Sequence, residues 1–82
     1  MLQFSERAII AIERAQPSEK GALNHALKSL ETGHPKNPTA VRIRGEHRIF
    51  AIRVTDDIRL LYSDSSGKVI VHDIINRSEY AP

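Results

Sequence analysis

The chain has 82 residues, the size of one small domain, and such a domain buries only about 60% of the surface that its unfolded chain exposes. It contains no cysteine, which excludes disulfide bonds and cysteine-based zinc sites and favours a reducing compartment. Its net charge of +2 is too small to require a nucleic-acid partner. With neither a signal-peptide pattern nor a membrane-length apolar stretch, the sequence predicts a soluble, cytoplasmic, single domain over residues 1–82 that has no membrane partner.

The N-terminal part predicts a helix over residues 5–15. Ala8, Ile12 and Ala15 fall on one stripe at helical spacing, and Ser5 is a suitable N-cap. Residues 2–4 have the composition of a short strand before this helix.

A second helix follows a short break at residues 16–19, where either Pro17 lies in the first turn or Ser18 caps the helix. Its apolar residues recur at helical spacing: Ala22, Leu23, Ala26, Leu27 and Leu30. Gly33, followed by Pro35, supplies the stop signals. Two helices joined by so short a break predict a helical hairpin.

After an irregular connection the pattern changes to strands. Expected strands cover Val41 to Ile43, residues 47–54, 58–63 and 69–75, separated by turns that include 55–57 and the Ser- and Gly-rich loop 63–68. Helices first and a strand meander afterwards predict an α+β fold. We expect a small antiparallel β-sheet with the N-terminal helical hairpin packed on one of its faces.

Strand alternation divides these residues between the two faces of the sheet. The core set comprises Phe50, Ile52, Val54, Ile58, Leu60 and Tyr62. Arg53 and Arg59 then meet on the uncovered face, where two like charges repel unless an anion lies between them. Asp73 is one internal candidate for that anion. An RNA phosphate or an acidic protein segment is the functional alternative, and the pattern does not choose between them.

The histidines do not have the spacing of metal ligands, and the sequence predicts neither a metal site nor a cofactor. His47 shares strand parity with Arg53 and is either a general acid or base or an exposed strand residue. His72 has the parity of Ile70 and Ile74, which indicates a hydrogen-bonded histidine at the edge of the core.

Residues 44–62, RGEHRIFAIRVTDDIRLLY, resemble the central signature of the RelE/ParE superfamily of toxins. There a Gly after a basic residue leads to a strand with an aromatic and basic residues, and a turn then leads to an Arg-aliphatic-aliphatic-Tyr strand. Residues 74–80, IINRSEY, resemble the family's ending, in which an Arg precedes a terminal Tyr. The resemblance covers nearly the whole chain and implies a RelE-like toxin of a type II toxin-antitoxin system.

The resemblance also implies an activity. RelE-like members are mRNA interferases, endoribonucleases that cut messenger RNA in the ribosome without a metal and so inhibit translation. By this resemblance, Arg53 is the catalytic basic residue, Arg59 and Arg77 stabilise the phosphate, and Tyr80 stacks on or positions the nucleotide. Independently of the resemblance, the arginines clustered in one short stretch predict either a localised RNA- or anion-binding face or a solvated arginine-rich face of the sheet. The candidate RNA- and anion-binding residues are Arg42, Arg44, His47 and Arg48.

Departures from the family pattern keep other activities open. Ala51 stands where ribosome-dependent members often carry a lysine, and Asn76 stands where a histidine or lysine is frequent. The alternatives are a ParE-like inhibitor of DNA gyrase without nuclease activity and a degenerate, non-catalytic member that binds an antitoxin. The implied partners are a cognate antitoxin, the ribosome with its messenger RNA or else DNA gyrase, and operator DNA through the antitoxin only.

Overall fold

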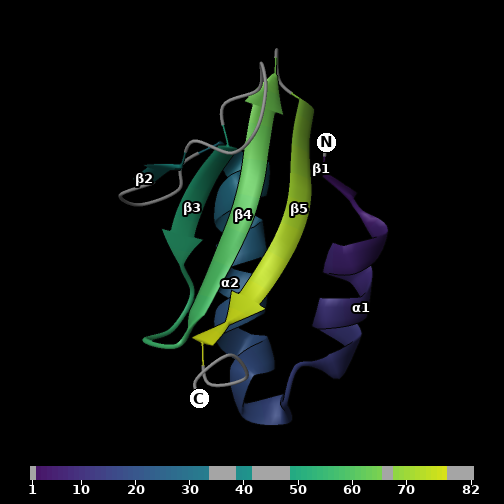
Figure 1. The fold of residues 1–82 in the computed structure, drawn as a ribbon, viewed down its shortest axis with the longest axis vertical. Helices are drawn as coiled ribbons and strands as arrows, with labels where there is room; N and C mark the ends of the chain where they lie inside the picture. The colour runs from purple at the N-terminus through teal and green to yellow at the C-terminus, as the bar shows by residue number, and fades with distance from the viewer. Residues whose placement is uncertain (1, 34–38, 42–48, 66–67, 78–82) are drawn as a thin grey trace.

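The computed structural model describes residues 2–33, 39–41, 49–65 and 68–77. Their elements, in chain order, are β1 (Leu2–Phe4), α1 (Glu6–Arg14), α2 (Pro17–Thr32), β2 (Thr39–Val41), β3 (Ile49–Arg53), β4 (Ile58–Ser65) and β5 (Lys68–Asn76). Figure 1 shows α2 crossing behind the sheet and α1 lying along the side of β5. We call the opposite side of the sheet, which faces the viewer, the uncovered face.

The sheet has the strand order β1-β5-β4-β3-β2. From β2 to β5 it is the expected antiparallel meander. At one edge β1 pairs in parallel with β5, so the sheet is mixed. The predicted α+β fold and helical hairpin are confirmed. The parallel edge strand β1 differs from the purely antiparallel sheet that the sequence predicted. Two parallel neighbouring strands need a long connection along the chain. Here that connection contains both helices and the other three described strands.

Capping residues mark where α1 begins and where α2 begins and ends. The Ser5 hydroxyl accepts a hydrogen bond from the Ala8 amide at 3.1 Å, which confirms the predicted N-cap of α1. Pro17 is the first residue of α2, and the alternative cap at Ser18 is wrong because Gln16 is the N-cap. Gly33 ends α2 with a φ of 79°, a left-handed conformation that glycine adopts without steric penalty.

The core lies between the helices and the sheet. Its buried cluster comprises Ala8, Leu23, Ala26, Leu30, Ile52, Leu60, Tyr62, Val69 and Val71. Phe50, Val54 and Ile74 pack against this cluster, and Ile58 is also buried. The core-facing residues predicted on β3 and β4 are therefore confirmed. No helix among the described residues is long and apolar enough to cross a membrane.

An irregularity in the β4·β5 pairing changes which face the β5 residues occupy. Ser63 pairs with Ile70 and Tyr62 with Val71, whereas Leu61 pairs with Asp73. The extra residue on β5 is His72, as in a β-bulge. Ile70 and Ile74 therefore do not share a face, and the parity assigned to His72 from uniform alternation is wrong.

Candidate anion-binding site

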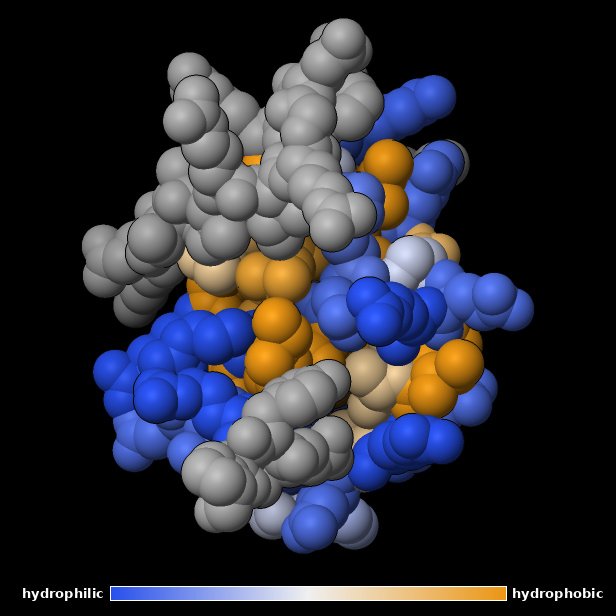
Figure 2. All heavy atoms as spheres, viewed as in Figure 1, coloured by the Kyte–Doolittle hydropathy of each residue, from blue (hydrophilic) through white to orange (hydrophobic). Residues whose placement is uncertain are grey.

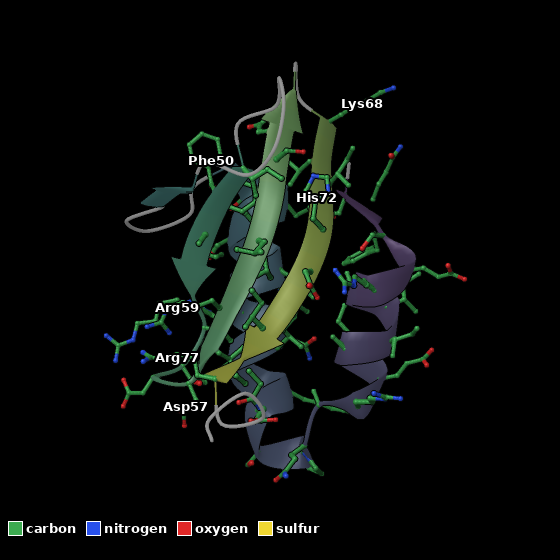
Figure 3. The ribbon with its side chains drawn as sticks, in the orientation of Figure 1. Phe50, Asp57, Arg59, Lys68, His72 and Arg77 are labelled. Carbon is green, nitrogen blue, oxygen red and sulfur yellow. The ribbon has the colours of Figure 1, made fainter. Side chains whose placement is uncertain are left out.

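Arg53, Arg59 and Arg77 come together at one end of the sheet, which we call the cation end. Arg53 closes β3 and is paired directly with Arg59 of β4. Arg77 follows β5, and its main-chain N–H donates to the carbonyl of Asp57 in the β3–β4 turn at 2.7 Å. Figure 3 shows Arg59, Arg77 and Asp57 close together at this end of the ribbon. Three segments that are distant in sequence thus bring their arginines to one place.

The guanidinium of Arg53 already has an anionic partner. It forms an ion pair with the carboxylate of Asp56, three residues further along the turn. The Arg53 side chain is 63% exposed and that of Asp56 84%. Asp73, the internal partner suggested by the sequence, instead lies 3.9 Å from Arg7 of α1.

Arg59 uses one end of its guanidinium to hold the turn. Its Nη1 donates to the main-chain carbonyls of Thr55, Asp56 and Ile58, at 2.8, 3.3 and 3.2 Å. Carbonyl oxygens are neutral acceptors, so these bonds fix the side chain without cancelling its charge. Arg59 is therefore a half-buried cation whose position depends on the turn.

Arg77 is exposed, and no carboxylate among the described residues forms an ion pair with it. The described charges at this end are thus three arginines against Asp56 and Asp57, of which only Arg53 and Asp56 are paired. In Figure 2 a hydrophilic area surrounds this end, and apolar surface lies beside it over the middle of the sheet. Cations next to apolar surface suit a ligand with phosphates and bases.

His72 also lies on the uncovered face, farther along β5 (Figure 3). Its Nε2 is 2.7 Å from the hydroxyl of Ser63, which is almost fully buried. This bond satisfies a buried hydroxyl, and it agrees with the prediction that His72 is a hydrogen-bonded residue.

The remaining predicted site residues lie outside the described part of the chain. They are Tyr80, Arg42, Arg44, His47 and Arg48. Ala51, the first departure from the family pattern, is described and pairs with Leu61 on the uncovered face. This part of the face is therefore apolar.

A groove of about 490 Å³ runs between α1, the start of α2 and β5. Arg7 and Arg14 line it from α1, two turns apart, with Ile10 and Ala11 between them. Glu19 also lines the groove, but its carboxylate accepts a hydrogen bond from the main-chain N–H of Gln16 at 3.0 Å. This groove was not predicted from the sequence, although the seven-residue spacing of the two arginines places both on one side of the helix.

The ion pair of Asp56 with Arg53 was also not predicted from the sequence. The distance of three residues between the two, across a turn, was a readable signal for an ion pair. Among the described residues, no three His, Asp or Glu side chains gather into a group that could hold a metal ion.

No protein-family model matches the sequence, and no curated protein sequence matches it significantly. Solved structures do match. The chain is similar to the archaeal RelE–RelB complex from Pyrococcus horikoshii OT3, with 13% identity over 93% of this chain and 92% of that one and a TM-score of 0.74. For the intact RelBE toxin-antitoxin complex of E. coli the values are 21% identity, 93% and 94% coverage and a TM-score of 0.69.

A third similar structure is YafQ from E. coli strain BL21(DE3), at 12% identity, with 100% of this chain and 98% of that chain covered and a TM-score of 0.74. At such identities the likeness establishes the fold. It spans almost all of each chain, and it agrees with the order of helices and strands described above. The chain therefore has the RelE-like toxin fold.

Proposed function

We propose that this protein is the toxin of a type II toxin-antitoxin system and that it cleaves ribosome-bound messenger RNA in the cytoplasm. The observation that carries the proposal is the gathering of Arg53, Arg59 and Arg77 at the cation end of the sheet. The RelE-like fold, together with the resemblance of residues 44–62 and 74–80 to the RelE signature, supports the same function.

The chemistry matches the residues at the cation end. When a 2′-hydroxyl attacks the adjacent phosphate, it loses its proton and forms a 2′,3′-cyclic phosphate, and the 5′-oxygen of the next nucleotide leaves and takes up a proton. Negative charge builds on the nonbridging oxygens during this step, and fixed guanidinium groups stabilise it. Arg59 is positioned by the turn, and Arg77 is exposed beside it. In this proposal these two residues hold the reacting phosphate.

Proton transfer has no obvious agent among the described arginines, because a guanidinium stays protonated at any working pH. The apolar pair of Ala51 and Leu61 occupies the part of the face where the family pattern often has a lysine. This pair favours a second candidate, a ParE-like poison that binds DNA gyrase and cleaves no RNA.

The proposal includes a cognate antitoxin, as in the solved RelE–RelB and YoeB–YefM complexes. The groove beside α1 suits a segment of such a partner. Arg7 already has Asp73 at 3.9 Å, so Arg14 would meet the acidic side chain. Ile10, which is 46% exposed, would be covered by an apolar one. A segment that folds on binding can supply both kinds of contact.

The decisive experiment is induced expression of the wild type and of Arg77→Ala without an antitoxin. Growth, messenger RNA integrity and gyrase-dependent DNA breaks are read in parallel. We expect growth arrest with cleaved messenger RNA for the wild type, and relief for Arg77→Ala. Lys28→Ala, which removes an exposed cation from α2, is the matched control and should remain toxic.

The possible outcomes separate the candidates. Intact messenger RNA together with gyrase-dependent breaks would replace the ribonuclease with the gyrase poison. If a stable, well-expressed wild type left growth unaffected, both toxic activities would be wrong and a non-catalytic, antitoxin-binding role would remain.

A further inference from the structure

The three arginines of the cation end differ in what they contact, and the difference lies in Asp56. Arg53 is ion-paired with the Asp56 carboxylate, whereas Arg59 contacts neutral carbonyls and Arg77 has no carboxylate partner among the described residues. One of the three cations is thus neutralised by the protein itself. The neutralising group stands on the turn that connects β3 to β4.

We propose that Asp56 is an internal competitor for Arg53 and makes the cation end selective for ligands with several adjacent phosphates. This inference rests on the proposed function, because it assumes that a polyanion binds there. In the free protein the Asp56 carboxylate occupies the position that a phosphate oxygen would take. A ligand that uses Arg53 must therefore displace Asp56.

Exposure makes this displacement feasible. Ion pairs between solvent-exposed side chains are weak, and both members of this pair are more than half exposed. The carboxylate can consequently leave without a large change in the fold. The released Asp56 nevertheless stays on the same short turn, so its charge still opposes an anion bound close to Arg53.

Selectivity follows from comparing ligands. An isolated phosphate that replaces Asp56 exchanges one anion for another at Arg53 and gains little. A strand with consecutive phosphates can contact Arg59 and Arg77 at the same time, and these linked contacts offset the loss of the internal pair. The turn thus discriminates against single anions and favours a polymer.

Asp57 provides a matched comparison on the same turn. It is exposed like Asp56, and it forms no ion pair with any described cation. Asp57→Asn therefore changes the net charge as Asp56→Asn does, but leaves the Arg53 pair in place. Asp56→Glu keeps a carboxylate that can reach Arg53 and serves as the conservative variant.

The test measures binding of a fluorescent oligouridylate by anisotropy over a series of salt concentrations. Asp56→Asn, which removes the competitor, should tighten RNA binding severalfold. It should also steepen the slope of log K against log salt by about 0.7, the value for one more phosphate contact to a single strand. Asp57→Asn should give a smaller change without the steeper slope, and Asp56→Glu should resemble the wild type. In an Arg53→Ala background the effect of Asp56→Asn should fall to that of Asp57→Asn, because only the loss of one negative charge on the turn remains.

Equal effects of Asp56→Asn and Asp57→Asn in the wild-type background would overturn the proposal, as would an Asp56→Asn effect that is undiminished without Arg53. A second measurement does not depend on RNA. Phenylglyoxal modifies free guanidinium groups, so mass spectrometry should show faster labelling of Arg53 in Asp56→Asn than in the wild type. Equal labelling rates would refute the internal competition, whereas faster labelling without any RNA binding would uphold the competition and count against the proposed function.

Discussion

The hydroxyl of Ser5 donates a 2.6 Å hydrogen bond to the main-chain carbonyl of His72, 67 positions later in the chain. The same hydroxyl accepts from the Ala8 amide, so it caps α1 and fastens the helix to β5 in one place. His72 is the additional residue of the β5 irregularity, and its ring contacts Ser63. Two short contacts thus connect the first helix to the uncovered face of the sheet.

Ser5→Ala should lower the free energy of unfolding by about 2 kcal/mol, the combined effect of a lost N-cap and a lost long-range hydrogen bond. Urea unfolding followed by circular dichroism measures the change. Ser18→Ala, at an exposed position in the first turn of α2, is the control and should change the stability by less than about 0.5 kcal/mol. Equal effects of the two substitutions would show that the Ser5 contacts are not stabilising.

Leu60 and Leu61 offer a comparison between the two faces of one strand. Leu60 is fully buried, whereas Leu61 is half-buried on the uncovered face. Leu60→Ala should destabilise the fold by about 3 kcal/mol because it leaves a cavity, and Leu61→Ala by about 1 kcal/mol or less. Thermal unfolding of both variants tests this order, and a reversed order would contradict the assignment of the faces.

Alanine variants of Arg59 and Arg77 should differ in their effect on stability, although both should weaken RNA binding. Arg59→Ala removes the bonds to the turn carbonyls and should cost about 1 kcal/mol of stability as well as affinity for single-stranded RNA. Arg77→Ala should leave the stability unchanged and reduce the salt slope of binding by about 0.7. Chemical unfolding and anisotropy titrations measure the two properties, and Arg77→Lys controls for charge. Unchanged RNA binding in both variants would remove the cation end from the proposed function.

Tyr62 should make the protein sensitive to alkali. Burial, and secondly the nearby charge of Asp64, raise the pKa of the Tyr62 hydroxyl above its ordinary value of 10.0. As the pH rises, Tyr62 therefore ionises in the unfolded chain before it ionises in the folded protein. The neutral Tyr62 contributes its full stabilisation of the folded state below pH 10, and this contribution is lost as the pH rises through the folded-state pKa. Compared with Tyr62→Phe, the wild type should lose more stability above pH 10. Parallel pH curves for the two proteins would contradict this.

Arg14 tests the groove as a docking surface for the antitoxin. Arg14→Glu reverses an exposed charge on α1 and should weaken binding of the cognate antitoxin at least tenfold while toxicity stays intact. Isothermal titration calorimetry with the purified antitoxin measures the affinity. Glu13→Arg, an exposed neighbour that does not line the groove, is the matched control. Unchanged affinity for Arg14→Glu would move the antitoxin to another surface.

Local patterns predicted those features that depend on local chemistry. The Ser5 cap, the Gly33 stop and the alternation of Ile52 and Leu60 into the core follow from residues within a turn or a strand. The pairing of Arg53 with Arg59 was also predictable, because a short turn sets the register of adjacent strands.

Other features depend on contacts that a local pattern does not encode. The parallel pairing of β1 with β5 joins the two ends of the chain. The irregularity at His72 breaks the period of two, which is why alternation assigned Ile70 and Ile74 to one face. The roles of Tyr80 and His47 stay predictions because both lie outside the described residues.

The parallel pairing of β1 with β5 has a consequence for synthesis on the ribosome. By the time residue 65 has been added, four of the five described strands have been made, yet the partner of β1 and the main support of α1 are still missing. Native folding therefore finishes after β5 has emerged, and a chain cut short before residue 68 has no route to the native sheet. A prematurely terminated copy should be a substrate for proteases and not a fragment with residual activity.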